Sequence, residues 1–174
     1  MNLFYFDASA LAKAYIDEKG TAIVERILEN TSEKQWRVLT LGLLETISIF
    51  VRKKNSGAIT PAFFQSTLQT FTEEFLENLR VFKVEATNAL CVAAVPLIQK
   101  HSINSTDAVV LRSALDIAAH ERRQGNELIL VTADKRLVTA TKAEGLQVIN
   151  PETATLAEIE KLLQADSPAQ SNAE

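Results

Sequence analysis

Hydrophobic positions along the chain fall into two kinds of stretch. Five short runs are almost continuously apolar, as in buried strands, and the longer segments between them carry apolar residues at helical spacing. The five runs are NLFYF (2–6), RVLT (37–40), RVFKV (80–84), LILVT (128–132) and LQVIN (146–150). Because strands that alternate with helices form parallel sheets with both faces covered, the pattern predicts an α/β fold around a five-stranded parallel sheet.

Two proline positions predict how particular helices begin or break. Thr60 and Pro61 place a capping residue before a proline at the first helical position, which predicts a helix over 61–79. Pro96 lies inside the helical segment 87–100, where its missing amide hydrogen predicts a kink or two shorter helices. Both are local predictions that a structure can test directly.

Length and composition indicate one globular domain with a short extension. The 174 residues include 47% hydrophobic residues, 5 Gly and 4 Pro, which excludes disordered and low-complexity chains. We expect the domain to span 1–151 and a C-terminal helix, with a capping box at Thr155 and Glu158, to span 152–165. Residues 166–174 have no strongly apolar side chain and are expected to form a disordered tail.

The cellular setting can be predicted from what the sequence contains and lacks. The single cysteine, Cys91, lies in an apolar run, so we expect a buried structural thiol, no disulfide and a reducing compartment. No basic leader precedes an apolar segment, and no apolar run approaches the roughly 18 residues of a membrane span. These features predict a soluble, cytoplasmic protein with no membrane partner.

The distribution of charge changes what the net charge of -4 implies. Nucleic-acid-binding proteins usually carry a basic balance, which the whole chain lacks. Residues 151–174 contain five acidic residues and one basic residue, so this segment accounts for the excess, while 1–150 hold 17 of each. If metal ions neutralise some of the acids in 1–150, the remaining surface there is net basic.

Four carboxylates lie in places that simple solvation does not explain. Asp7 follows the first strand run and Asp134 follows the fourth, while Asp107 directly precedes an apolar helical segment. Taken singly, Asp7 and Asp134 are equally well explained as helix N-caps, and Asp107 as an acid favoured by a helix dipole.

Glu45 is harder to explain by local structure. Its apolar neighbours on a helix are Leu41, Leu44, Ile49 and Phe50. They predict a face packed in the core, where an unpaired carboxylate costs several kcal/mol unless it is neutralised or coordinated. Lys13 or Arg112 could satisfy Glu45 as a structural partner.

Together the four acids predict a metal site. Residues at the carboxyl ends of parallel strands converge on one crevice, and helices beside that crevice can add further ligands. Carboxylates crowded in one pocket repel each other unless a cation neutralises them, and oxygen ligands without His or Cys point to Mg²⁺ or Mn²⁺. Such a cation binds phosphate oxygens, so the residues predict hydrolysis of phosphodiester bonds.

The segments that carry these acids resemble a known family. FDASALAKAY, TLGLLETISIFVRK, INSTDAVVLRSAL and LVTADKRLVTATKAEGLQVINP are similar, in order and spacing, to the four motifs of the PIN domain, and within it most similar to VapC-type toxin ribonucleases. The resemblance covers about residues 2–151. It implies a three-layer α/β/α sandwich whose central parallel sheet has the strand order 3-2-1-4-5. It also implies an Mg²⁺-dependent endoribonuclease that leaves a 5′-phosphate and a 3′-hydroxyl.

The same resemblance assigns roles to residues. Four acids match the family's catalytic and metal-binding quartet: Asp7, Glu45, Asp107 and Asp134. Ser9 and Thr132 match hydroxyl positions that support the metal site. We expect one or two metal ions held by Asp7, Asp107 and Asp134 to activate a water molecule, with Glu45 completing the ligand set or orienting that water.

Basic residues near the expected crevice are candidates for binding RNA phosphates. They are Lys13, Arg52, Lys53, Lys54, Arg112, Lys135 and Arg136. Phosphate contacts give affinity that depends on salt and carries little sequence information. Because Lys and Arg also favour helix C-termini, a solvated helix end is the simpler interpretation of any one cluster.

Partners and departures follow from the family resemblance. It implies a homodimer and, for the toxins, a cognate antitoxin that covers the active-site groove. VapC-type sequences often have a histidine three positions after the third acid, where this chain has Val110. The acidic segment after Pro151 lies outside the motifs, and one hypothesis is that it shields a basic surface until RNA displaces it.

Other functions fit parts of the pattern. A solitary PIN nuclease or a non-catalytic PIN-like module that binds RNA or protein would have the same fold, although the presence of all four acids argues against the non-catalytic module. An aspartate-nucleophile phosphatase needs a second aspartate where this chain has Ser9, and a phosphoacceptor receiver needs one where it has Glu85.

Overall fold

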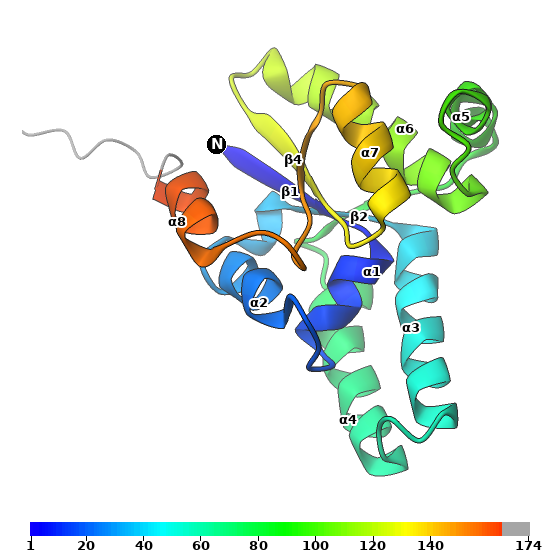
Figure 1. Ribbon diagram of the computed structural model, residues 1–174, viewed down its shortest axis with the longest axis vertical. Helices are drawn as coiled ribbons and strands as arrows, with labels where there is room; N and C mark the ends of the chain where they lie inside the picture. The colour runs from blue at the N-terminus through cyan, green and yellow to red at the C-terminus, as the bar shows by residue number, and fades with distance from the viewer. Residues whose placement is uncertain (165–174) are drawn as a thin grey trace, which may run out of the picture.

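The computed structural model describes residues 1–164, and their strands form one parallel sheet (Figure 1). The strands are β1 (Asn2–Phe6), β2 (Trp36–Leu39), β3 (Phe82–Val84), β4 (Glu127–Val131) and β5 (Gln147–Ile149). Their order across the sheet is β3-β2-β1-β4-β5, and every neighbouring pair is parallel. The predicted α/β fold and strand order are confirmed, and each strand overlaps the apolar run that predicted it.

Helices cover both faces of this sheet, which makes three layers. The helices are α1 (Ala8–Leu11), α2 (Thr21–Glu29), α3 (Thr40–Asn55), α4 (Pro61–Phe71), α5 (Asn88–His101), α6 (Ser105–Arg122), α7 (Lys135–Ala143) and α8 (Leu156–Gln164). In Figure 1, α2 and α8 lie on one side of the strands, and α5, α6 and α7 lie on the other. Shorter turns at Ala12–Ala14, Glu33–Gln35 and Thr72–Leu76 connect some of these elements.

The central strand β1 shows why the sequence forms three layers. Successive side chains of a strand point to opposite faces, and β1 is apolar in both directions. Phe4 and Phe6 pack into the apolar core on the α1, α2 and α8 side, whereas Leu3 and Tyr5 pack with α5, α6 and α7. A strand that is buried on both faces reads as a continuous apolar run, which is the pattern that predicted it.

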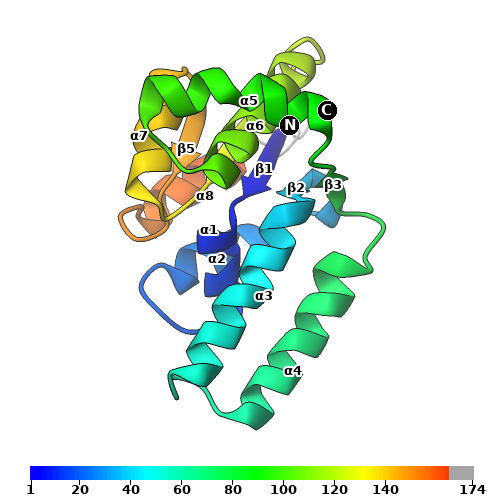
Figure 2. The same cartoon turned by 90° about the vertical axis from the view of Figure 1, so that its right-hand side faces the viewer.

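Helices α3 and α4 form a hairpin that projects beyond the sheet (Figure 2). The hydroxyl of Thr60 accepts a hydrogen bond from the Phe63 amide at 3.1 Å, so the predicted cap at Thr60-Pro61 is present. The helix is shorter than predicted, because α4 ends at Phe71 and the chain continues as a π-helical turn over Thr72–Leu76. That turn places Phe75, which is fully buried, against the rings of Phe71 and Trp36.

Helix α5 corrects two of the predictions. It runs unbroken from Asn88 to His101 with Pro96 inside it, so the prediction of two shorter helices is wrong. Cys91 is exposed, so the prediction of a buried structural thiol is also wrong. The inner face of α5 is formed by Ala94 and Leu97, and Cys91 and Val92 lie on the outer face. One apolar run therefore supplies a buried stripe and an exposed one.

The segment after β5 is built onto the domain through α8. Its Ile159 is buried in the core beside α2, and the carbonyl of Leu162 accepts a hydrogen bond from the Asn2 side chain at 2.9 Å. The capping box is present, since the Glu158 side chain accepts a hydrogen bond from the Thr155 amide at 2.7 Å. The helix begins at Leu156 rather than at 152.

The tail predicted for 166–174 lies outside the described residues. Within 1–164, none of the helices combines the length and the apolar character needed to cross a bilayer.

Candidate active site

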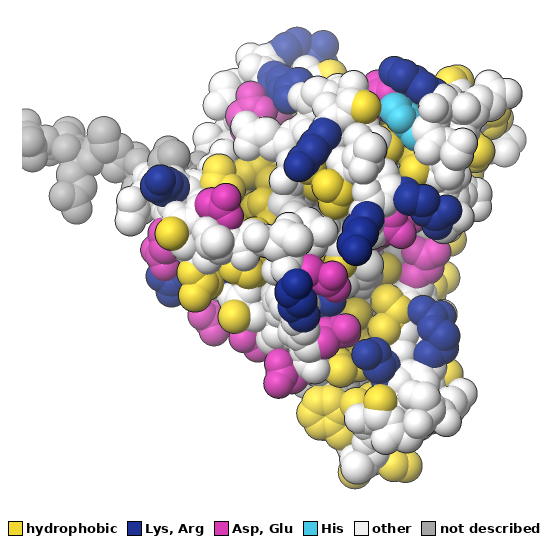
Figure 3. Space-filling model, viewed as in Figure 1, with side chains coloured by type: hydrophobic (Ala, Val, Ile, Leu, Met, Phe, Trp, Pro, Cys, Tyr) yellow, Lys and Arg dark blue, Asp and Glu magenta, His cyan; other side chains and the backbone are white. Residues whose placement is uncertain are grey.

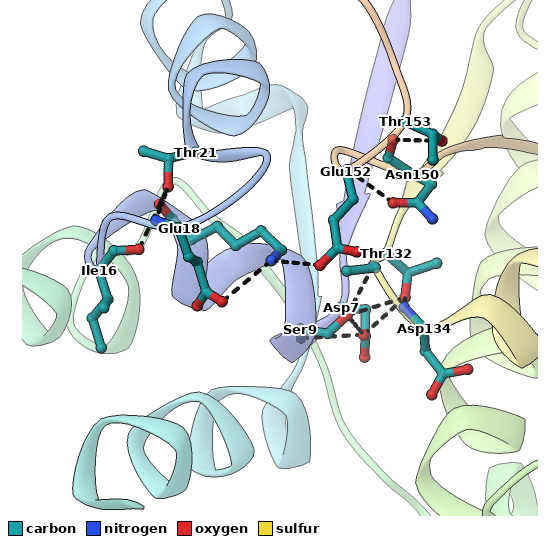
Figure 4. Close-up of polar contacts among 12 residues, drawn as sticks. Asp7, Ser9, Ile16, Glu18, Thr21, Thr132, Asp134, Asn150, Glu152 and Thr153 are labelled. Atoms are coloured by element: carbon teal, nitrogen blue, oxygen red, sulfur yellow. Dashed lines mark hydrogen bonds and ion pairs between the residues drawn. The ribbon is translucent and has the colours of Figure 1, made fainter. Parts of the chain in front are cut away.

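Asp7 lies at the carboxyl end of β1, where the chain turns directly into α1. It is 5% exposed, and its amide donates a hydrogen bond to the carbonyl of Val131 on β4 at 3.0 Å. The Oδ2 atom accepts hydrogen bonds from the Ser9 amide (3.2 Å), the Ser9 hydroxyl (2.6 Å) and the Thr132 hydroxyl (3.0 Å), as Figure 4 shows. One carboxylate oxygen therefore caps α1. Within residues 1–164, the other oxygen accepts no hydrogen bond.

The two hydroxyl residues tie the ends of β1 and β4 together. Besides binding Asp7, the Ser9 hydroxyl accepts a hydrogen bond from the Ala133 amide at 2.9 Å. The Thr132 hydroxyl likewise accepts one from the Asp134 amide at 3.1 Å. Ser9 and Thr132 thus fix the direction of Asp7 and of the backbone that carries Asp134, which agrees with the supporting role suggested by the family resemblance.

Thr132→Val is expected to destabilise the protein by about 1–3 kcal/mol, because Val keeps the shape but cannot donate to the buried Asp7 carboxylate or accept from the half-buried Asp134 amide. Urea unfolding measures the loss. Thr141→Val is the matched control, since Thr141 is equally buried but its hydroxyl bonds a carbonyl of its own helix. Equal losses in the two variants would show that Thr132 has no special role in holding the strand ends.

Asp134 lies at the start of α7 and combines two roles that the sequence left as alternatives. Its Oδ1 accepts hydrogen bonds from the amides of Arg136 (2.7 Å) and Leu137 (3.0 Å), which is an N-cap. The same side chain lines a cleft with Asp7. The N-cap interpretation is confirmed for both aspartates, and it does not exclude a second role, because a carboxylate has two oxygens.

Asp107 is in the first turn of α6, and its carboxyl lines the cleft with the other three acids. Burial, together with the negative charges of Asp7, Asp134 and Glu45, raises the pKa of its carboxyl to about 6. Its Oδ2 is buried and has no hydrogen-bond partner within residues 1–164. A carboxylate oxygen in this state is costly unless a proton or a cation satisfies it.

Glu45 reaches the cleft from the middle of α3, but it is half-exposed rather than buried. The prediction that its helix face packs in the core is wrong for two neighbours, since Leu41 and Leu44 are 40% and 58% exposed. Phe50, the fourth predicted neighbour, is buried as expected and shares the buried face of α3 with Leu43. The structural partners predicted for Glu45 are paired elsewhere: Lys13 binds other glutamates and Arg112 binds Asp116.

The structure brings all four acids to one cleft at the carboxyl edge of the sheet. The cleft has a volume of about 450 Å³ and is lined by Asp7, Ala8, Ser9, Glu45, Ser48, Ile49, Arg52, Asp107 and Asp134. Figure 3 shows acidic side chains gathered where the start of α7 faces α3, with Lys and Arg side chains around them. A larger hollow of about 530 Å³ between α7, β5 and α8 contains none of the predicted site residues.

The donor set suits a hard divalent cation, although the side chains are not closed around one. Among the described residues, no group of three or more His, Cys, Asp or Glu side chains has the arrangement of a metal site. The unpartnered Asp107 oxygen and the raised pKa of its carboxyl are what carboxylates show when a site's positive charge is missing. The oxygen-only donor set therefore fits Mg²⁺ or Mn²⁺ in chemistry.

The predicted phosphate-binding residues separate into two groups. Arg52 lines the acidic cleft, and Lys53 lines a neighbouring hollow. Lys135 is exposed in the first turn of α7. Lys13 is buried in ion pairs, and Arg112 is paired along α6 with Asp116, so these two have carboxylate partners in place of phosphate.

Sequence reasoning missed Glu152, which approaches the same edge of the sheet. It follows β5 and accepts a hydrogen bond from the Lys13 ammonium at 3.0 Å. A signal was present in the sequence: the rule that carboxyl ends of parallel strands converge was applied to Asp7 and Asp134 but not to the turn after β5.

Comparisons with known proteins find relatives by structure only. Neither the scan of protein-family models nor the search of curated proteins gives a match. PAE2754 from Pyrobaculum aerophilum matches with a TM-score of 0.58 at 17% identity, covering 95% of this chain and 97% of that one. VapC20 from Mycobacterium tuberculosis, a sarcin-ricin loop cleaving toxin, matches with a TM-score of 0.56 at 14% identity, covering 79% and 94%. A toxin-antitoxin complex from Klebsiella pneumoniae matches with a TM-score of 0.52 at 16% identity, covering 84% and 96%.

These likenesses agree with the architecture and identify the fold. The chain is a three-layer α/β/α protein with a carboxylate-lined cleft at the carboxyl edge of a parallel sheet. More specifically, its fold is the PIN-like fold that VapC-type toxins have. The fold prediction made from the four sequence motifs is confirmed.

Proposed function

We propose that this protein is a divalent-metal-dependent endoribonuclease and the toxin of a type II toxin-antitoxin pair. The observation that carries the proposal is the convergence of four carboxylates from four separate elements on one cleft. The fold supports it, because structural neighbours include a toxin that cleaves the sarcin-ricin loop and a toxin-antitoxin complex.

The roles of the residues follow from their environments. Asp7, Asp107 and Asp134 would hold Mg²⁺ or Mn²⁺, which supplies an activated water and neutralises charge on the phosphate when bound. Ser9 and Thr132 keep Asp7 directed into the cleft. Glu45, on the opposite wall, completes the ligand set or orients the attacking water. Arg52, on the rim, binds a phosphate oxygen of the RNA.

The proposal is tested by asking whether RNA cleavage requires a divalent cation. We expect RNA cleavage in Mg²⁺ or Mn²⁺, none in EDTA, and full recovery when the metal is restored. Metal binding should also raise the melting temperature of the wild-type protein, since it removes repulsion among the carboxylates of the cleft. The expected stabilisation is about 2.7 kcal/mol at a metal concentration 100 times the dissociation constant. Cleavage that continues in EDTA would rule out the metal-carboxylate mechanism.

The partner predictions belong to the same proposal. One of the neighbouring structures is the toxin-antitoxin complex from Klebsiella pneumoniae, which supports a cognate antitoxin for this chain. A homodimer and a cytoplasmic location are further parts of the proposal. Co-expression with the product of a short neighbouring reading frame, followed by co-purification, tests the antitoxin. If no such reading frame is present, or if its product does not bind this protein, the result favours the solitary PIN nuclease.

A further inference from the structure

Beside the acidic cleft lies a second hollow of about 340 Å³, here called the mixed-charge lobe. It is lined by Ser9, Ala12, Lys13, Glu18, Ile49, Lys53, Ala133, Asp134 and Glu152. Three of these residues, Ser9, Ile49 and Asp134, also line the acidic cleft. The two hollows therefore adjoin each other and share part of their wall.

An alternating chain of charges runs through the mixed-charge lobe. Lys13 is 3% exposed, and its Nζ lies 3.0 Å from Oε1 of Glu152 and 3.5 Å from Oε2 of Glu18. Lys53 lies 3.7 Å from the other oxygen of Glu18. Figure 4 shows the Glu152 side chain beside the contacts among Asp7, Ser9 and Thr132. The Glu152 carboxylate accepts its hydrogen bond from Lys13 at this place.

The surroundings of Glu152 are those of an anion site. The hydrogen bond from Lys13, followed by the positive charges of Lys13, Lys19 and Lys135, lowers the pKa of its carboxyl. These lysines come from three separate segments of the chain: the turn after α1, the loop before α2 and the start of α7. Cations from separate segments around one carboxylate suit a phosphate in the same position equally well.

The backbone of Glu152 is held in place, whereas its side chain is partly exposed to solvent. The Glu152 amide donates a hydrogen bond to the Asn150 side chain at 2.9 Å. The neighbouring Pro151 packs closely on Gly20, since a Cβ added to Gly20 would lie 2.8 Å from the Pro151 carbonyl. The Glu152 side chain itself is 31% exposed. A rotation of that side chain into solvent would open the lysines without moving the turn.

We propose that the mixed-charge lobe binds the RNA phosphate next to the scissile one, and that Glu152 occupies this position in the free protein. RNA binding then exchanges the Glu152 carboxylate for a phosphate on Lys13, so Glu152 lowers the affinity for RNA. This inference rests on the proposed ribonuclease function. It also assigns to one residue, Glu152, the shielding of a basic surface that was suggested for the acidic C-terminal segment as a whole.

The test compares Glu152→Gln with wild type in binding a labelled single-stranded RNA of about ten nucleotides, in EDTA and over a range of salt. We expect the variant to bind about three- to tenfold more tightly at low salt, with a log-log salt slope steeper by about 0.7, as for one more phosphate contact. Lys53→Gln should weaken binding. Glu160→Gln is the matched control, because it removes the same charge from the same segment at a site paired with Arg26 on α2.

The outcomes separate this inference from the proposed function. If wild type binds and cleaves RNA but Glu152→Gln has the affinity and salt slope of wild type, the lobe inference is wrong and the ribonuclease proposal stands. An equal gain in Glu160→Gln would reduce the effect to net charge and also overturn the inference. If none of the proteins binds or cleaves RNA, the proposed function falls, and the inference falls with it.

Discussion

Asp107→Asn is expected to abolish RNA cleavage and, in the absence of metal, to make the protein more stable. The loss of activity follows from removing a proposed metal ligand, since a bound metal contributes several kcal/mol to stabilising the transition state, or about 1,000-fold in rate. The gain in stability has a different cause. Asn removes the half-buried negative charge of Asp107. The pKa of that carboxyl is raised by burial and by the charges of Asp7, Asp134 and Glu45.

The sign of the stability change depends on pH. The raised pKa means that the folded protein binds the Asp107 proton more tightly than the unfolded chain does, so wild-type stability falls as pH rises from about 4 through about 6. The Asn variant has no such pH dependence, so the difference in stability between the variant and wild type should reach its largest value at pH 7. Because the side chain is half-exposed, we discount for screening and expect about 1 kcal/mol, or about 2–4 °C in melting temperature.

The control for this pair of effects is Asp116→Asn. Asp116 is on the same helix but is exposed and paired with Arg112, outside the cleft. It should leave both cleavage and the metal-free melting temperature nearly unchanged. A metal-free Asp107→Asn protein that is less stable than wild type at pH 7, or one that still cleaves RNA, would contradict the assignment of Asp107 as an unsatisfied ligand.

Phe71→Ala is expected to cost about 3–5 kcal/mol of stability, or about 10 °C in melting temperature. Phe71 is fully buried at the end of α4, and its ring contacts those of Tyr15, Phe50 and Phe75 at centroid distances of 5.3, 5.5 and 5.7 Å. This cluster joins the projecting hairpin to the rest of the domain. Thermal and urea unfolding measure the loss.

Phe63→Ala serves as the comparison, because Phe63 is on the same helix and is 45% exposed. Its truncation should change stability by about 0.5 kcal/mol or less. Similar losses in the two variants would mean that the hairpin is stabilised by α4 as a whole rather than by the aromatic cluster.

The fold could be predicted well because its signals are local and repeated. Strands such as β1 and β4 are apolar on both faces, and the four motifs fix their order through the family resemblance. The errors occurred where a run of apolar residues serves two environments. Cys91 and Leu44 lie in apolar segments, yet each is on the outer face of a helix, and the sequence does not say which face is covered.

The site was predicted in its acids but not in its ion pairs. Asp7 and Asp134 could be located because a strand end has a known direction. The partners of Lys13 depend on how the turn after β5 returns toward the loop before α2, which is a contact across 139 positions that no local pattern encodes. For the same reason Glu152 was counted with a solvated C-terminal segment.

The hydrogen bond from Thr132 to Asp7 joins residues 125 positions apart, and this has a consequence for the order of events during synthesis. Strand β1 is made first but lies in the centre of the sheet, between β2 and β4, so its second neighbour arrives only after most of the chain has emerged. Contacts of such long range form late in folding and form slowly. A nascent chain would therefore lack the complete acidic cleft until β4 and Asp134 have left the ribosome.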